Sequence, residues 1–298
     1  MQANSLEHFA KKIKSITYTG MAVNCALAII KIIIGKLSGS LSLVADGIHS
    51  FSDLLTDIMV IFGVMIGSKK ADYDHPYGHG RAETFASGFI ALILTIVGGA
   101  MIYAATVSIA KDKITEPHIT VLIAALISIV AKEWLYKATK KIAILSHSSS
   151  LYANAWHHRS DSLSSVAVLV GFIALEFGFG HGDQVAAIAV GLMIIFVAVH
   201  IISDTFRELT EGAADSETIK QIEQTLRKHS DIRQWHKLRT RTVGREIFVD
   251  VHILVDPELN VSDAHEITEA LEKTLKEQIK RPINIIIHIE PDLPELRK

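Results

Sequence analysis

Six long apolar stretches alternate with short polar connections along the first two thirds of the chain. Each is close to the ~20 residues that a helix needs to cross a bilayer. After about residue 205 the pattern changes to the short mixed segments of a water-soluble domain. The pattern therefore predicts a membrane all-α six-helix bundle over residues 1–205 and a cytoplasmic domain over residues 206–298. The six apolar stretches are residues 16–37, 41–67, 84–108, 117–137, 155–178 and 184–205.

The second domain shows helical spacing of apolar residues in two segments and alternation in three others. This order predicts a small α+β domain, ferredoxin-like, with an α-β-β-α-β sequence and the helices on one face of the sheet. Gly244 marks a tight turn between the first two strands. The predicted elements are a helix capped by Asp215, strands 235–243 and 246–255, a helix capped by Ser262, and a last strand from Ile283.

A stripe of ionisable residues runs through the second apolar stretch. His49 and Asp53 are four residues apart and therefore project from one face of a helix, and Asp46 and Asp57 extend the same face. An ionisable side chain in the middle of a bilayer costs roughly 2.5–3.5 kcal/mol and needs a partner or a wet cavity. The central pair is thus predicted to be functional, whereas Asp46 and Asp57 either line a pathway or cap helix ends near the interfaces.

The fifth stretch repeats this spacing with His157 and Asp161. Two helices that each offer an imidazole and a carboxylate can surround one divalent ion with four ligands. A tetrahedral nitrogen and oxygen site without thiolate suits zinc, and Co²⁺, Cd²⁺ or Fe²⁺ also fit. His158 is interpreted as a neighbour that points elsewhere.

The chemistry of such a site favours binding and release over catalysis. Four protein ligands leave no position for a reactive water, and the sequence has no HExxH motif, so we expect no enzyme activity. The ligands bind metal only when deprotonated, so metal exchanges with protons. Alternating exposure of the site would turn this exchange into transport.

Composition and charge limit the kinds of partner and metal site that we expect for this protein. The formal net charge of −2 argues against nucleic acid, and the single Cys25 excludes a disulfide framework or a thiolate-rich site. The N-terminus lacks the features of a cleavable signal peptide. Lysine and arginine are concentrated in the N-terminal segment and in the second and fourth connections, which predicts that both termini are cytoplasmic.

The paired His-x-x-x-Asp motifs, on the second and fifth of six spans and followed by an α+β domain, resemble the cation diffusion facilitator family, of the bacterial zinc and iron efflux type. The resemblance covers nearly the whole chain. It implies a homodimeric metal/proton antiporter in the cell (inner) membrane that exports a divalent metal, zinc before manganese or iron. A membrane-anchored metal sensor is the alternative from another class. By the resemblance, His49, Asp53, His157 and Asp161 form the transport site.

The resemblance also implies metal sites outside the membrane, with Zn²⁺ as a regulatory ligand as well as the substrate. Asp72, His75 and His79 resemble a loop site of some members, and a solvated polar loop is the alternative. An ion pair between Arg81 and Glu211 is expected to link the two domains. In the soluble domain the implied ligands are His236, His252, His288 and Glu290, with His265 bridging near the dimer interface.

Overall fold

The computed structural model describes residues 2–38, 50, 53–111, 119–177, 179, 181–279 and 281–297. The chain divides into two compact units. One is Glu7–Thr205, and the other joins Met1–Leu6 to Phe206–Lys298.

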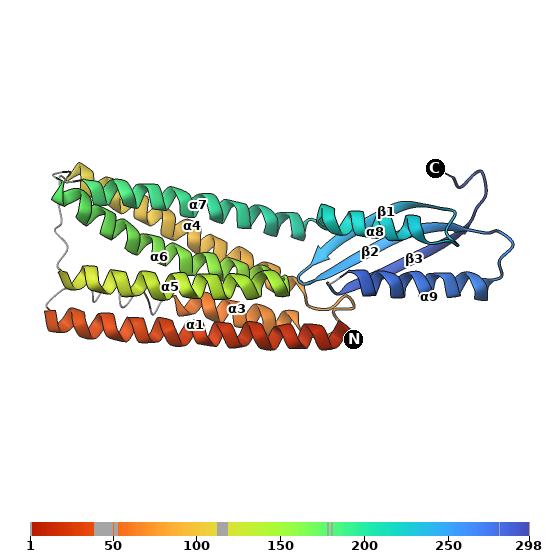
Figure 1. The fold of residues 1–298 in the computed structure, drawn as a ribbon, viewed down its shortest axis with the longest axis horizontal. Coiled ribbons are helices and arrows are strands. Elements are labelled where there is room, and N and C mark those ends of the chain that lie inside the picture. The colour runs from red at the N-terminus through yellow and green to blue at the C-terminus, as the bar shows by residue number, and fades with distance from the viewer. Residues whose placement is uncertain are drawn as a thin grey trace. The chain divides into compact units, whose positions relative to one another are not determined.

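Several helices of the helical unit extend beyond the apolar stretches of the sequence, because polar residues continue the helix past the membrane-length run. The first part of the second stretch, 41–49, lies outside the described residues. The helices are α1 (Gln2–Ser38), α3 (Leu54–Gly67), α4 (Arg81–Ala110), α5 (Ile119–Ser146), α6 (Ser149–Glu176) and α7 (Gly182–Leu209) (Figure 1).

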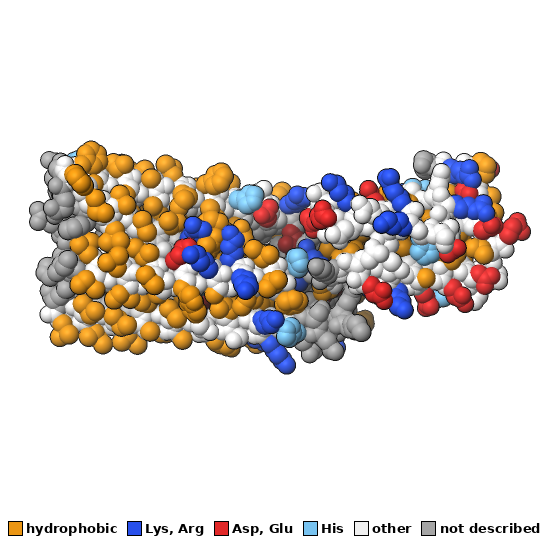
Figure 2. Space-filling view, in the orientation of Figure 1, with side chains coloured by type: hydrophobic (Ala, Val, Ile, Leu, Met, Phe, Trp, Pro, Cys, Tyr) orange, Lys and Arg blue, Asp and Glu red, His pale blue; other side chains and the backbone are white. Residues whose placement is uncertain are grey.

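The surface and interior of this unit are the reverse of those of a soluble protein. Large apolar side chains cover the outer face (Figure 2), among them Phe62 and Phe196, which are 57% and 75% exposed. Asp57, Lys132 and His157 are instead buried. Among the described residues, the helices within His8–Ile34, Arg81–Ala110 and Gln184–Leu209 are long and apolar enough to cross a membrane. An apolar exterior around a polar interior is the arrangement that lipid requires.

Helices α4 and α7 cross at two glycines. A Cβ atom added to Gly98 would lie 2.9 Å from the Gly191 carbonyl oxygen, and one added to Gly191 would lie 2.9 Å from the Gly98 carbonyl oxygen. Each glycine therefore lets the other backbone approach closely, as small residues do at contacts between membrane helices.

The C-terminal unit is a three-stranded sheet of order β1-β2-β3. Strands β1 and β2 are antiparallel, and β2 and β3 are parallel. Alternate residues of β2, from Ile247 to Val255, pack with Ile222 and Leu271 of the two helices in one apolar core. The elements are α8 (Ser216–Lys228), β1 (Gln234–Val243), β2 (Glu246–Val255), α9 (Val261–Gln278) and β3 (Ile283–Pro291).

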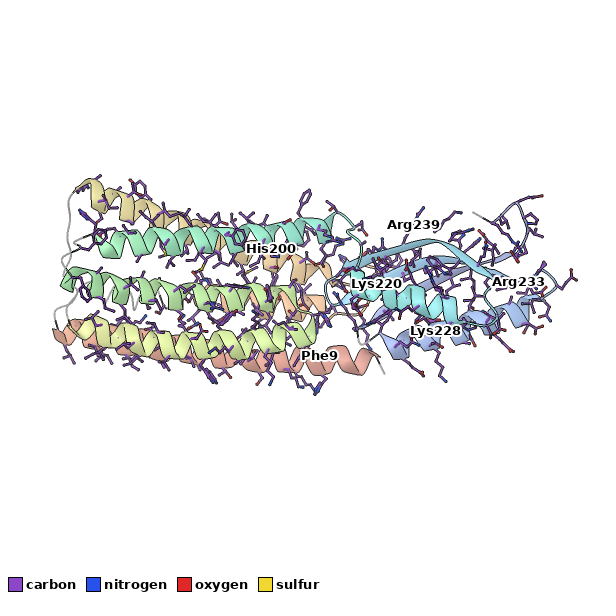
Figure 3. The ribbon with its side chains drawn as sticks, turned by 45° about the horizontal axis from the view of Figure 1, so that its top comes forward. Phe9, His200, Lys220, Lys228, Arg233 and Arg239 are labelled. Carbon is purple, nitrogen blue, oxygen red and sulfur yellow. The ribbon has the colours of Figure 1, made fainter. Side chains whose placement is uncertain are left out.

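The outer side of α8 is charged and carries Lys220 and Lys228 (Figure 3). The predicted order of helices and strands is confirmed. The predicted cap at Asp215 is also confirmed, because its carboxylate accepts a hydrogen bond from the Thr218 amide. Gly244 has a φ of 57° in the predicted hairpin turn.

The predicted cap at Ser262 is wrong. The N-cap lies two residues earlier, at Asn260, which accepts a hydrogen bond from the Asp263 amide, and helix α9 begins at Val261. Asparagine and serine are both good N-caps. Asn260 takes the role because its backbone is extended and its side-chain oxygen reaches the amide of the third helical residue.

Candidate metal centres

Three of the predicted transport ligands meet inside the helical unit. Asp53 directly precedes α3, and His157 and Asp161 lie one turn apart on α6. One ligand atom from each of the three residues lies within 4.8 Å of the others, a spacing that one metal ion can bridge. Asp53 Oδ1 is 3.4 Å from His157 Nε2, and Asp161 Oδ2 is 4.0 Å from the same nitrogen.

This membrane cluster of Asp53, His157 and Asp161 is shielded from solvent. Asp53 and His157 are 3% and 2% exposed. The Nδ1 atom of His157 has no hydrogen-bond partner among the described residues. A buried imidazole nitrogen that lacks a hydrogen bond is costly, which is typical of a site that binds a ligand. The predicted fourth ligand His49 lies outside the described residues, as does Asp46.

A third helix also contributes to the membrane cluster. Lys132 of α5 is buried, and its Nζ atom donates to Asp53 Oδ2 at 3.0 Å and to Asp161 Oδ2 at 2.7 Å. Lys132 was not among the site residues predicted from the sequence, because an ammonium is not a metal ligand. The sequence nevertheless pointed to it, because Lys132 falls within the fourth predicted span, and an ionisable residue inside a membrane span is costly and often marks a functional site.

Asp57 lies in a second buried network, next to the membrane cluster. Its two carboxylate oxygens accept hydrogen bonds from Asn24 at 3.0 Å and Asn154 at 2.7 Å. His158 Nε2 lies 3.8 Å from Asp57 Oδ1, so His158 points to Asp57 while its neighbour His157 points to Asp53. Asp57 is fully buried in the first turn of α3. Its role in a pathway stays a prediction.

The connection between α3 and α4 brings Asp72, His75 and His79 together, again with ligand atoms within 4.8 Å of one another. Asp72 Oδ1 accepts the backbone N–H of His75 at 2.7 Å, and Oδ2 lies 3.5 Å from His79 Nε2. The backbone hydrogen bond from His75, aided by the two imidazoles, lowers the pKa of Asp72. The carboxylate is thus held in the charged form that binds metal.

A third cluster lies on the sheet face opposite α8 and α9. His236, His252 and His288 occupy the same level of the three strands, because each is paired with the next in the register. A bulge between His236 and Arg239, where Lys237 has a φ of 51°, sets this alignment on β1. The alternation of β2 then turns His252 away from the apolar core.

Glu290 joins this group. Its Oε1 lies 2.7 Å from His252 Nδ1, and its Oε2 lies 3.0 Å from His236 Nε2. The hydrogen bond with His252 is the main reason that the pKa of Glu290 is lowered. His236, His252 and Glu290 each offer a ligand atom within 4.8 Å of the others. His288 lies at the rim, with its Nε2 3.6 Å from Glu290 Oε1 and its side chain 62% exposed.

Two predicted residues do not join these clusters. His265 is exposed on α9, and its nearest carboxylate is Glu269 at 3.4 Å. Its role at a dimer interface stays a prediction. Glu211 accepts a hydrogen bond from Arg241 at 3.1 Å within the C-terminal unit. Its pairing with Arg81, which would connect the two units, also stays a prediction.

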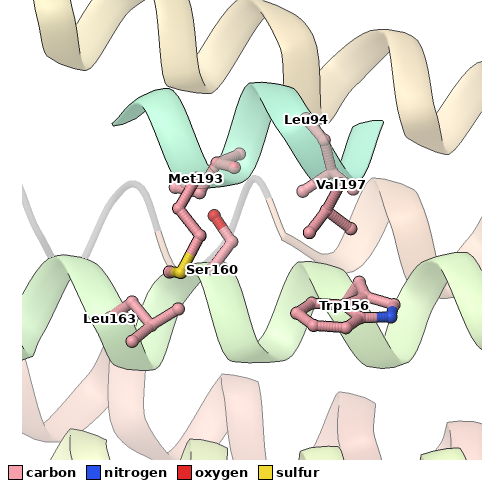
Figure 4. Close-up of a pocket in the computed structure, with 7 residues that line it drawn as sticks. Leu94, Trp156, Ser160, Leu163, Met193 and Val197 are labelled. Atoms are coloured by element: carbon pink, nitrogen blue, oxygen red, sulfur yellow. The ribbon is translucent and has the colours of Figure 1, made fainter. Parts of the chain in front are cut away.

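A small pocket between α4, α6 and α7 differs chemically from these clusters (Figure 4). Leu94, Trp156, Leu163 and Met193 contribute to its lining, and the polar groups that line it are those of Trp156 and Ser160. Among the residues that the structure describes, no carboxylate or imidazole lines this pocket, and those residues offer no metal ligand there.

Comparisons with known proteins agree with this arrangement. The family model described as the cation efflux transmembrane domain matches residues 18–210, and that of the cation efflux protein cytoplasmic domain matches residues 214–292. An uncharacterized transporter of Methanocaldococcus jannaschii is 36% identical over 267 residues, covering 90% of this chain and 94% of that protein.

Two further relatives carry more specific names. The manganese efflux system protein MneS of Bacillus subtilis is 32% identical over 281 residues, covering 94% of this chain and 96% of that protein. The magnetosome protein MamM of Magnetospirillum gryphiswaldense is 31% identical over 270 residues, covering 90% of this chain and 85% of that protein.

These matches confirm the predicted fold class of a six-helix transmembrane domain followed by an α-β-β-α-β cytoplasmic domain. They also confirm that the chain is a transporter and not an enzyme. It is an integral membrane protein with its C-terminal domain in the cytoplasm. The chain belongs to the cation diffusion facilitator family of divalent metal cation efflux transporters.

Proposed function

We propose that this protein exports Zn²⁺ from the cytoplasm across the cell (inner) membrane in exchange for protons, by alternating access to the membrane cluster. The observation that supports this most directly is the convergence of Asp53, His157 and Asp161 in the buried interior, with ligand atoms within 4.8 Å of one another. Imidazole and carboxylate ligands without thiolate suit Zn²⁺. His49 is the proposed fourth ligand.

Proton exchange follows from the chemistry of these groups. Imidazole and carboxylate bind a metal ion only after they lose their protons, so metal and protons compete for the same atoms. The ion binds from the cytoplasmic side and leaves on the other side, where protons take its place. In this proposal both termini are cytoplasmic, as the concentration of lysine and arginine in the N-terminal segment and in the second and fourth connections indicates.

Manganese is the second candidate substrate. Two of the three residues of the membrane cluster are carboxylates, and oxygen ligands suit Mn²⁺ better than imidazole does. The relative from Bacillus subtilis is named a manganese efflux protein. A metal-competition flux assay across a pH gradient, with Zn²⁺, Mn²⁺, Fe²⁺, Co²⁺ and Cd²⁺, decides between them. Transport of Mn²⁺ in preference to Zn²⁺ would contradict the zinc assignment.

The cytoplasmic cluster of His236, His252 and Glu290 is proposed to be a regulatory metal site in a homodimer. A metal ion that binds the dimer better than the monomer shifts the equilibrium toward the dimer. A membrane-anchored metal sensor would need this cluster but no pathway. Flux of Zn²⁺ into proteoliposomes distinguishes the transporter from the sensor.

The central test removes one ligand of the membrane cluster. Asp161→Ala should reduce Zn²⁺ uptake into inverted vesicles by about tenfold or more, since loss of even an outer partner of a metal ligand costs 10–100-fold. The matched control is Asp204→Ala, which removes a carboxylate that is 67% exposed near the end of α7. Unchanged uptake in a folded Asp161→Ala protein would reject the membrane cluster as the transport site.

A further inference from the structure

Lys132 places a positive charge of the protein itself between the two carboxylates of the membrane cluster. Its Nζ atom lies 3.0 Å from Asp53 Oδ2 and 2.7 Å from Asp161 Oδ2, and only 2% of the side chain is exposed. An ammonium has three donors and no acceptor, and short bonds to carboxylates are its strongest interactions. The position that joins the two carboxylates is therefore filled by a cation supplied from α5.

This position overlaps with the one that a metal ion needs. A Zn²⁺ ion binds carboxylate oxygens at about 2.0–2.2 Å. Asp161 Oδ2 is both the acceptor for Lys132 and the oxygen that lies 4.0 Å from His157 Nε2. The two carboxylate oxygens of Asp53 have different neighbours, because Oδ1 lies near His157 and Oδ2 accepts a hydrogen bond from Lys132. An ion held by His157 and by this oxygen of Asp161 would therefore share Asp161 Oδ2 with the ammonium.

The charges lead to the same conclusion. The two carboxylates and the ammonium carry a net charge of −1, so a divalent ion brings the group to +1. Without the lysine, the two carboxylates would carry a net charge of −2, and a bound divalent ion would bring the group to 0. Two cations a few ångströms apart in a poorly solvated interior repel strongly. The lysine therefore weakens metal binding at the membrane cluster.

We propose that Lys132 is a tethered cation that competes with the transported metal ion for Asp53 and Asp161. It holds the two carboxylates together when no metal is bound, and the incoming ion displaces it from them. Its return assists release of the ion, and the lysine stays charged throughout. This inference rests on the proposed function of the membrane cluster.

The test compares Zn²⁺ binding by purified full-length variants in detergent. The parent carries two substitutions that weaken the other candidate metal sites. His75→Ala removes one residue from the group of Asp72, His75 and His79, and His252→Ala removes one from the cytoplasmic cluster. Calorimetry of this parent is intended to report Zn²⁺ binding at the membrane cluster. Lys132→Met removes the charge and keeps the length of the side chain. We expect it to bind Zn²⁺ about tenfold more tightly than the parent, and to transport Zn²⁺ several-fold more slowly in proteoliposomes because release slows.

The matched control is Lys137→Met, which makes the same change on the same helix at a side chain that is 72% exposed. It should leave affinity and flux unchanged. Lys132→Arg keeps the charge and should stay close to the parent in affinity. Lys132→Gln removes the charge but keeps a hydrogen-bond donor, and it replaces the methionine variant if that one does not fold.

Each outcome decides the inference. A purely structural lysine would lower the melting temperature of the metal-free protein without any gain in Zn²⁺ affinity, and that result would overturn the proposal. Failure of both neutral variants to fold would also count against it. The proposed function fails in a different way, because the parent would then bind Zn²⁺ no better than the same protein with Asp161→Ala.

Discussion

At the scale of single residues, the helical unit pairs its buried charges with groups from other helices. Asp57 of α3 accepts hydrogen bonds from Asn24 of α1 and Asn154 of α6, and Asp53 accepts one from Lys132 of α5. Charged groups in a membrane interior are stable only with such partners. The same contacts therefore both stabilise the bundle and arrange the site.

Asp215 gives a prediction at this scale. Burial alone would raise its pKa, but the hydrogen bonds from the Thr218 amide and hydroxyl outweigh burial, so the pKa lies below the ordinary value of 3.8. The charged cap thus contributes its stability in full above that value, and the contribution is lost as the pH falls through the lowered pKa.

Asp215→Ala should destabilise the start of α8 by about 1 kcal/mol, the usual value of an N-cap. Hydrogen–deuterium exchange of residues 216–228 in the full-length protein would then be faster by about fivefold. Asp215→Asn keeps the acceptor oxygen and should protect α8 from exchange at neutral pH. It should not lose this protection below pH 4, where the parent loses the contribution of the charged Asp215. The control Glu266→Ala, at an exposed position of α9, should change neither the exchange rate of α8 nor its dependence on pH. Equal exchange in Asp215→Ala and the parent would contradict the prediction.

How far the sequence predicts the site depends on the kind of residue. Asp53, His157 and Asp161 were predictable, because helical spacing alone places imidazole and carboxylate on one face. Lys132 was not assigned, because its role depends on which side of α5 faces α3 and α6, and spacing within one helix does not contain that information. The alignment of His236 with His252 depends on a bulge that no turn residue in the sequence marks.

At the scale of secondary-structure elements, the crossing of α4 and α7 depends on the absence of side chains. Gly98→Leu would bring its Cβ within 2.8 Å of Ile195 and 2.9 Å of the Gly191 carbonyl. Overpacking of this kind costs about 1–3 kcal/mol. The variant should therefore lower the melting temperature of the purified protein.

The neighbouring Gly99 is the matched control for this crossing. A Cβ atom at Gly99 would meet nothing within 4 Å, so Gly99→Leu should leave the melting temperature near that of the parent. A similar loss in both variants would show that leucine at any glycine of this segment is harmful, and that the crossing itself is not the cause.

The element pattern was otherwise readable from the sequence. Strand 246–255 was predicted with its observed bounds because alternation and the Gly244 turn define both ends. The helix ends in the membrane unit were harder to predict, since apolar runs mark the lipid-facing length and not the helix. Helix α5 continues to Ser146, well past the apolar stretch that ends at residue 137.

At the scale of the whole molecule, the cytoplasmic cluster is expected to couple metal level to assembly. Zn²⁺ should increase the dimer fraction of the full-length protein, and His252→Ala should reduce this effect, because a ligand stabilises the state that binds it. Analytical ultracentrifugation with and without Zn²⁺ measures the shift. His229→Ala is the control, since His229 lies outside the cluster, near Asp231. A dimer fraction independent of Zn²⁺ in the parent would contradict regulation through this site.

The cytoplasmic cluster takes one residue from each strand, His236 from β1, His252 from β2 and Glu290 from β3. An ion bound by all three would cross-link the entire sheet, including a parallel pair that no hairpin connects. Strand β3 is the last element among the described residues, and in this sheet it pairs along one edge, with β2. Chelation of the ion would consequently loosen that terminal strand first, before the hairpin of β1 and β2 is affected.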